Sequence, residues 1–464
     1  MHEQSAVQDA TPISVARRLA GWCNEFAASE VGAATWERGR AILLDSLGCA
    51  LFACSDEKAQ PVLRTVEALS GNTDCTVIGT KLRGSVPVAS FANGALIRTL
   101  DLNDTYAGPR QVGHPSDNIG AALAAAEVAD RSGDDLLRAI RLGYEIYGRV
   151  LDIGDPESPW DHVTVSGMVT AAMTGWLLRL SEDRFGHALA LASVHSATLG
   201  EVRVGHVSGA KSIASSVVTQ TASLLTLLAA KGVTGPEQAF EGVRGYAKLI
   251  LDGANFSTFF EEEGTPDRLL SVGLKQYPCF ALGQGPISAA IELRKRLRDP
   301  GDIEKLTVTI ANTGPARLRL RDGHGRMPAS REAADHSLYF LVAVALLDGH
   351  YGLDQLTAGR WQDDDVRNLI ERMEAGIDPA LTPPTSLPCR LVADLRGGER
   401  IVIDRPVTPG NAQMPLSWDE VKEKFRRCAA DALSGTAQSR VIEGVERIGD
   451  LASVRTLLKD LVPG

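Results

Sequence analysis

A charged segment between two apolar helices constrains the fold of this chain most strongly. The spacing of small and apolar residues predicts helices over residues 86–102 and 119–130. Asp101 stands at the end of the first helix, and Asp104 and His114 lie between the two helices. Charged side chains are costly in apolar surroundings unless they are paired or used in chemistry. We therefore expect packed helices that enclose a functional site.

The carboxylates of this segment have helical spacing. Asp101, Asp104 and Thr105 stand at positions i, i+3 and i+4. If the first helix continues for one more turn, these side chains project from the same side. Asp101-x-x-Asp104 in a helical setting also resembles a magnesium site of the isoprenoid-synthase kind, but no second acidic motif follows on a later helix. We therefore expect no metal here.

His114 is expected just before the N-terminus of the second helix. Pro115 disfavours a helical backbone at His114, and Ser116 begins a run of good N-cap residues. Unpaired N–H groups at a helix start favour an anion, and an imidazole beside an anion is a candidate acid or base. A purely structural reading remains open, in which Asp104 and Ser116 cap helices and His114 fills a loop.

Composition and charge restrict the partners and the compartment. The 464 residues, 44% of them hydrophobic, can form a large core and two domains. A net charge of −10 argues against nucleic acid or an anionic membrane surface as a partner. The seven cysteines lack CxxC spacing, and no apolar run approaches eighteen residues. We expect a soluble, cytoplasmic protein without a signal peptide.

A flexible lead-in followed by a long helix is expected within residues 205–231, with a lysine near the start of the helix. Its predicted inward-facing residues are Ile213, Val217, Leu224, Leu225 and Leu228. Lys211 lies in the first turn, where a cation opposes the helix dipole unless a carboxylate or another anion lies against it. A solvated surface lysine is the alternative. The Gly-Ala-Lys-Ser sequence lacks the spacing of a phosphate-binding loop, so we expect no nucleotide there.

The pattern changes to mixed α and β after Pro266. A strand is predicted over 305–311, a helix from Ser330 through Leu347, and a hairpin over 390–402. Ser417-x-x-Glu420 is a capping box that begins the C-terminal helices. The sequence thus predicts a mainly α protein, with a helical domain built from residues 1–267 and 409–464 and a smaller α/β domain over 268–408.

Several motifs in order resemble the MmgE/PrpD family, which includes 2-methylcitrate dehydratase, cis-aconitate decarboxylase and iminodisuccinate epimerase. These motifs span nearly the whole chain: Asp101-x-x-Asp104-Thr105, Gly113–Asn118, Trp160–Thr164, Tyr277–Cys279, Asp335–Ser337 and Ala343–Gly349. The resemblance implies an all-helical domain with a smaller α/β lid. It also implies a homodimer that works without a metal or an organic cofactor.

The resemblance also implies a set of active-site residues. The residues expected to be catalytic are His114, Asp101, His162 and Lys211. The residues expected to bind substrate are Thr105, Asp104, Lys275, Tyr277 and Gln284. Phe280 stands where decarboxylase members carry a histidine, and no histidine follows Lys211 in its segment, so decarboxylation is disfavoured. His336 fits a packing role as well as a site role.

The expected reaction is the elimination of water from a small hydroxylated di- or tricarboxylate, similar to 2-methylcitrate. His114 would transfer the proton, because an imidazole titrates near neutral pH. His162 and Lys211 would bind carboxylates and offset the charge of an aci-carboxylate. Asp101 would orient His114 or serve as a partner acid, although a structural role for it stays open. An epimerase, a decarboxylase and a non-catalytic carboxylate-binding protein remain alternatives.

Overall fold

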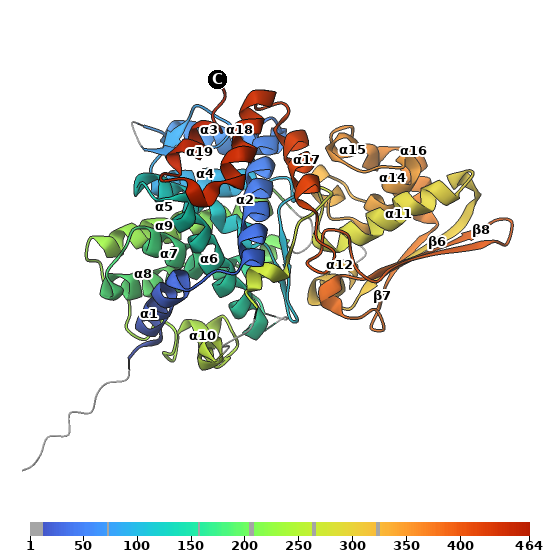
Figure 1. The fold of residues 1–464 in the computed structure, drawn as a ribbon. Helices are drawn as coiled ribbons and strands as arrows, with labels where there is room; N and C mark the ends of the chain where they lie inside the picture. Colours follow the sequence, from blue (N-terminus) through green and yellow to red (C-terminus); the bar gives the residue numbers. More distant parts are fainter. Residues whose placement is uncertain (1–12, 72–73, 156–157, 204–207, 262–265, 322–324) are drawn as a thin grey trace, which may run out of the picture.

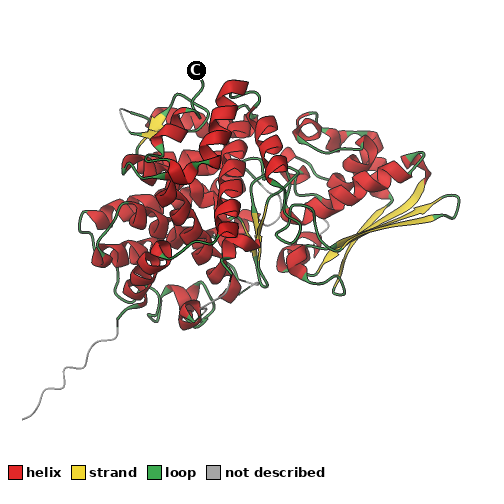
Figure 2. Cartoon of the chain, viewed as in Figure 1, coloured by secondary structure: helices red, strands yellow, loops and turns green. Residues whose placement is uncertain are grey.

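The computed structural model describes residues 13–71, 74–155, 158–203, 208–261, 266–321 and 325–464. Helices dominate this described part, and the strands form three small sheets. Figure 2 shows most of the strand residues gathered in one unit of the molecule. The predicted mainly α fold with a smaller α/β part is therefore confirmed.

The larger unit, here called the helical body, is a bundle of helices around one core. Its helices before the α/β part are α1 (Val15–Ala28), α2 (Ala33–Cys54), α3 (Gln60–Leu69), α4 (Val86–Arg98), α5 (Ile119–Val128), α6 (Gly133–Ile153), α7 (Val165–Leu177), α8 (Glu182–His195), α9 (Ala210–Ala230) and α10 (Tyr246–Leu249). A short hairpin of β1 (Cys75–Thr76) and β2 (Arg83–Gly84) lies beside α4 and α5.

Small residues let the central helices approach closely. Helix α4 packs against α2, α5 and α9. A Cβ atom added to Gly120 of α5 would lie 2.5 Å from the backbone nitrogen of Gly94 in α4. The two helices therefore touch at backbone level, and the segment that joins them is held between them.

That joining segment differs from the prediction. Helix α4 ends at Arg98 rather than continuing to residue 102, and Asp101 has a φ of 51°. Thr105 begins β3 (Thr105–Ala107), which pairs with β4 (Val112–Gly113) and β5 (Val272–Gly273). The expectation that Asp101 and Thr105 project from one helix side is wrong, because a left-handed residue cannot continue a right-handed helix.

The inward face predicted for α9 is wrong at three of its five positions, while Ile213 and Leu225 are partly buried against core residues. Val217, Leu224 and Leu228 are 45%, 49% and 38% exposed. The buried face carries smaller residues such as Ala214 and Ala222, with Lys211 at its start. Small side chains allow α9 to lie close to α4, and this close approach decides which face is buried.

Within the described ranges, one helix, α9, has the length and the apolar composition that would allow it to cross a membrane. Its most apolar 18-residue window has a mean hydropathy of 1.5, and half of that window is buried. It packs against α4, α7 and α8. A mostly buried core helix in a soluble protein passes the same test.

The smaller unit, the α/β unit, has its own core around a four-stranded sheet in the order β7-β6-β8-β9. Only the β6–β7 pair in this sheet is parallel. Helices α11 and α14 lie against one face of it (Figure 1). Its elements are α11 (Gln284–Arg296), β6 (Ile303–Ala311), α12 (Gly314–Arg321), α13 (Arg331–Ala334), α14 (Leu338–Asp348), α15 (Leu353–Thr357), α16 (Asp364–Glu371), β7 (Met373–Asp378), β8 (Cys389–Leu395) and β9 (Arg400–Arg405).

The predicted helix from Ser330 through Leu347 is interrupted. Ser330 caps α13, and Ser337 caps α14 through a bond from the Phe340 N–H to the Ser337 hydroxyl. His336 lies in the interruption rather than in a helix turn, so its ring is free to point out of the α/β unit.

The chain returns to the helical body at its C-terminal end. The predicted capping box of Ser417 and Glu420 is present and begins α17 (Trp418–Ala429), followed by α18 (Gly435–Glu446) and α19 (Arg455–Lys459). Helix α17 lies beside α2 in Figure 1, with Val421 and Phe425 in the first core. Leu274 also belongs to that core. We therefore propose a first domain boundary just after Leu274, slightly beyond residue 268, and a second near residue 408.

The contact between α4 and α5 predicts a cost for a single methyl group. Gly120→Ala should lower the free energy of unfolding by about 1–3 kcal/mol, because the added carbon meets the α4 backbone and one helix must shift. Calorimetric melting would show the loss. Gly435→Ala in α18 is the matched control, since nothing lies within 4 Å of its Cβ position. Equal melting temperatures for the two variants would contradict the close packing.

Candidate active site

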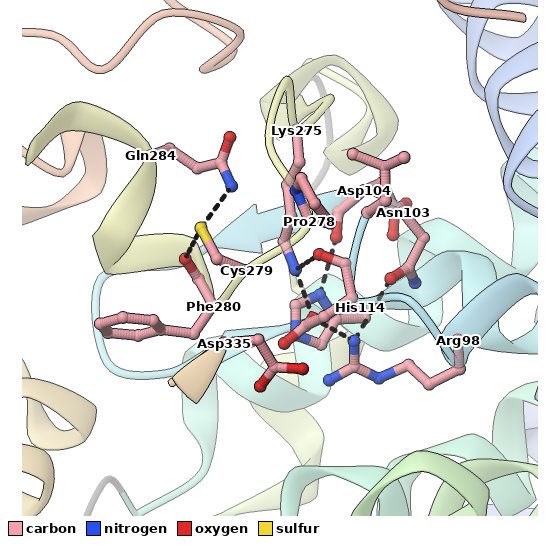
Figure 3. A network of polar contacts seen from close by, with 12 residues as sticks. Arg98, Asn103, Asp104, His114, Lys275, Pro278, Cys279, Phe280, Gln284 and Asp335 are labelled. Carbon is pink, nitrogen blue, oxygen red and sulfur yellow. Dashed lines mark hydrogen bonds and ion pairs between the residues drawn. The ribbon is translucent and has the colours of Figure 1, made fainter. Parts of the chain in front are cut away.

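The carboxylate of Asp101 is the centre of a buried charge cluster. Its Oδ1 lies 2.5 Å from Lys275 Nζ and in close contact with Arg98, and its Oδ2 lies 2.7 Å from Lys211 Nζ. His336 Nε2 is 3.2 Å from Oδ2. Lys275 also donates to the backbone carbonyl of Asp101, at 3.0 Å. Arg98 and side chains from three distant segments therefore converge on one residue. Figure 3 shows Arg98 and Lys275 of this cluster, with His114 beside them.

Three cations, Arg98, Lys211 and Lys275, contact the Asp101 carboxylate, and Arg98 Nε also lies 3.8 Å from Asp117 Oδ1. Burial alone would raise the pKa of Asp101, but Arg98, Lys211 and Lys275 together hold it well below its usual value. The pKa of Lys211 is also lowered, by burial and by the charge of Arg98, and burial lowers the pKa of Lys275. The Asp101 carboxylate faces several cations, whereas Lys211 and Lys275 share this one carboxylate. A further anion beside Lys211 and Lys275 would therefore be favoured by their charge.

His336 connects this cluster to a second carboxylate. Its Nδ1 contacts Asp335 Oδ1 closely, and Asp335 Oδ2 lies 2.8 Å from Lys58 Nζ. Burial would raise the pKa of Asp335, but Lys58 and His336 lower it below its usual value. His336 thus bridges Asp101 and Asp335. This contact identifies it as part of the site, where the sequence left its role open.

His114 lies beside the cations with one ring nitrogen unused. Its Nδ1 is 2.7 Å from the Asp104 carbonyl oxygen, so Nδ1 carries the proton and donates. Its Nε2 then has a free lone pair and no hydrogen bond to any described residue. Burial, followed by Arg98 and Lys275, lowers the pKa of His114 well below 6.5. His114 is therefore a neutral imidazole that can accept a proton.

His162 has the opposite tautomer because of a shared tyrosine. The Tyr147 hydroxyl accepts from the His114 backbone N–H at 3.2 Å and lies 2.8 Å from His162 Nδ1, so it donates to that nitrogen. His162 therefore carries its proton on Nε2. The ring centroids of His114 and His162 are 5.6 Å apart, edge to face. Burial and the charge of Arg203 lower the pKa of His162 to about 3.

Asp104 holds the loop rather than the cation cluster. Its Oδ1 accepts from the Ser116 N–H and hydroxyl, and its Oδ2 accepts from the Tyr144 hydroxyl at 2.6 Å. Burial raises its pKa to about 7. The expectation that Asp101 orients His114 is not what the structure shows, since the Asp104 carbonyl makes that contact. The capping reading of Ser116 also differs, because its hydroxyl donates to Asp104.

Three predicted substrate-binding residues lie around the edge of the site. The Thr105 hydroxyl is buried and has no partner among the described residues. The Gln284 amide bonds to the backbone of residues 276 and 277 and to the Cys279 thiol, so it fixes the loop that follows Lys275. Tyr277 packs near Tyr351, with ring centroids 6.5 Å apart.

Some residues of the site were missed by sequence reasoning, and Lys424 is the clearest case. From α17, its Nζ lies 2.5 Å from Asp45, 2.9 Å from the Leu102 carbonyl and 2.6 Å from the Lys275 carbonyl. It thereby holds the two loops that carry Asp101 and Lys275. A lysine on the buried stripe of α17 beside Phe425 was the available signal. Arg98 in an otherwise apolar helix was another.

The chemistry of the cluster does not suit a divalent cation. Both Asp101 oxygens already contact cationic or imidazole nitrogens, which would repel a metal ion. Across the described ranges, no group of three or more His, Cys, Asp or Glu residues is placed to hold a metal.

Comparison with known proteins gives the family. The profile of the MmgE/PrpD N-terminal domain matches residues 17–258, and that of the MmgE/PrpD C-terminal domain matches residues 277–450. The chain belongs to the MmgE/PrpD family. Members of this family therefore provide the appropriate comparison for the site.

Two kinds of MmgE/PrpD enzyme are similar to this chain. It is 25% identical to the cis-aconitate decarboxylase of Mus musculus over 475 residues, which cover 96% of this chain and 93% of that protein. It is 31% identical to the 2-methylcitrate dehydratase of Cupriavidus necator over 378 residues, with 75% and 74% covered. The 2-methylcitrate dehydratase of Escherichia coli (strain K12) is 29% identical, with 86% and 87% covered.

The cluster predicts the effect of removing its anion. Asp101→Asn should destabilise the protein by about 3–5 kcal/mol, because it leaves buried cations without their carboxylate. Thermal unfolding would measure the loss. The double variant Asp101→Asn/Lys211→Met should recover part of it, since one uncompensated cation is removed. A wild-type melting temperature for Asp101→Asn would show that the carboxylate does not balance these charges.

Proposed function

We propose that this protein is a cofactor-independent lyase that eliminates water from a small hydroxylated di- or tricarboxylate. The observation that carries the proposal is a neutral imidazole, His114, with a free Nε2 beside a cluster of Arg98, Lys211 and Lys275. A base beside several cations suits proton abstraction next to a carboxylate. The similarity to 2-methylcitrate dehydratases supports the same chemistry.

The reaction begins with a substrate carboxylate at Lys211 and Lys275. His114 Nε2 takes a proton from the adjacent carbon, and the C–H electron pair moves into the carboxylate, which becomes an aci-carboxylate. Fixed cations stabilise that added charge without reorganisation. Thr105, whose buried hydroxyl has no described partner, donates a hydrogen bond to this carboxylate.

The second half of the reaction expels the hydroxyl group. The electron pair returns to form the carbon–carbon double bond, and the C–O bond breaks. His114 passes its proton to the departing oxygen, which leaves as water. His162 donates a hydrogen bond from Nε2 to that oxygen, a tautomer that Tyr147 maintains. Asp101 holds the lysines, while Asp104 and Gln284 position His114 and the Lys275 loop.

The same proposal includes a soluble, cytoplasmic homodimer. The exposed apolar face of α9, formed by Val217, Leu224 and Leu228, supports a partner subunit, because side chains of this kind gain from burial. The net charge of −10 argues against nucleic acid or an anionic membrane as that partner.

The reaction type can be tested in deuterated water with a panel of hydroxylated di- and tricarboxylates. We expect loss of the mass of one water. Solvent exchange without mass loss would indicate an epimerase, and release of carbon dioxide a decarboxylase. His114→Gln should lower kcat by about 10²–10⁴-fold, because it removes the base. The exposed His350, changed to Gln, is the control. Binding of the acids without turnover or exchange would contradict the proposal.

The pH dependence of kcat/KM should follow the lowered pKa of His114. A base must be unprotonated to act, and its pKa lies well below 6.5 in the folded protein. We therefore expect kcat/KM to stay level as pH falls to 6.5 and to decline only at lower pH. Initial rates across a pH series, with the fold checked by circular dichroism at each point, would measure this. An acid limb centred at or above pH 6.5 would rule out this role for His114.

A further inference from the structure

Arg319 is a cation of the α/β unit that forms no ion pair within the described part of the chain. It lies on α12, is partly buried, and has no hydrogen bond or ion pair with any residue that the structure describes. Buried arginines elsewhere contact carboxylates, as Arg141 does with Asp267 and Arg331 with Asp56. Burial and the like charge of Arg203 lower the pKa of Arg319 to about 10. An unpaired guanidinium in such surroundings is costly unless a ligand compensates it.

Aromatic stacking places Arg319 next to the charge cluster. Its guanidinium carbon is 5.7 Å from the centroid of the Phe280 ring. The Phe280 ring stacks on His336, with centroids 5.8 Å apart and planes at 23°. His336 in turn contacts Asp101. Arg319 is thus separated from the Asp101 cluster by two stacked rings.

Phe280 fixes the guanidinium without neutralising it. A guanidinium over an aromatic face is attracted by the ring quadrupole, but the ring supplies no hydrogen-bond acceptor. The N–H groups of Arg319 therefore remain available to a ligand. A planar guanidinium binds a carboxylate through two parallel hydrogen bonds, which gives both affinity and orientation.

Arg203 is a second cation near Arg319. It belongs to the helical body and pairs with Asp161, the residue before His162. Its charge is close enough to Arg319 to lower the pKa of that residue. Arg203 already has Asp161 as its ion-pair partner, whereas Arg319 has no ion pair with any described residue. The two residues come from different units, so a ligand at Arg319 lies between the units.

We propose that Arg319 binds a second carboxylate of the substrate, remote from the carboxylate held by Lys211 and Lys275. This inference rests on the proposed function, and it makes Arg319 a specificity-determining residue. Two cationic positions separated by the Phe280 and His336 rings select acids that carry two or three carboxylates. A monocarboxylate occupies the lysine position alone and gains nothing from Arg319.

The test compares the binding of a matched monocarboxylate, dicarboxylate and tricarboxylate by calorimetry. Arg319→Gln should weaken binding of the di- and tricarboxylates by about tenfold to a hundredfold and leave the monocarboxylate unchanged. Arg319→Lys should recover part of the loss, since it keeps the charge but not the paired geometry. Arg317→Gln, on the same helix and exposed, is the control and should bind all three acids as the wild type does. Melting temperatures establish that each variant is folded.

The outcomes separate this inference from the proposed reaction. An equal loss for all three acids, or no loss for any, would overturn the role of Arg319. Wild-type preference for polycarboxylates without turnover would reject the lyase reaction, while the Arg319→Gln comparison would still decide the carboxylate position. A wild-type protein that binds none of the acids would overturn both.

Discussion

The ion pairs of Asp101 with Lys211 and Lys275 are the constraint on which the site depends. A buried carboxylate without partners would be neutral or destabilising, and buried lysines alone would lose their protons. Pairing favours the charged form of each group, and each fixes the position of the others. The partners come from the end of α4, the start of α9 and the loop after β5. One carboxylate therefore determines how three distant segments meet, and His336 adds a fourth from the α/β unit.

The last helices of the chain support the same centre through backbone atoms. Lys424 donates to the carbonyls of Leu102 and Lys275 and is balanced by Asp45 of α2. Backbone carbonyls in a loop between helices would otherwise lack partners in a buried position. The return of α17 to the helical body thus has a direct consequence for the site. Lys424 holds the loop that carries Asp101 and the loop that carries Lys275 and leads into the α/β unit.

Sequence reasoning found the charged segment but not its conformation. His114 before a helix start and Lys211 in need of a carboxylate were predictable, because each follows from local rules. The left-handed backbone at Asp101 was not, since the side chain has its partners more than a hundred positions away and no local rule brings them together. The buried face of α9 was misjudged for a related reason. Hydrophobicity favoured its leucines, but the closeness of α4 favoured its small residues.

The charges of the site point to the kind of ligand that completes it. Lys211 and Lys275 share the Asp101 carboxylate, Arg98 pairs with both Asp101 and Asp117, and Arg319 has no ion pair with any described residue. His114 and His162 are kept neutral by burial and by complementary tautomers, so they add no charge. A ligand with one negative charge would pair with the lysines or with Arg319, but not with both. Two or three carboxylates would pair with both, and their binding would favour the charged form of Lys211, which in turn stabilises a carbanion beside it.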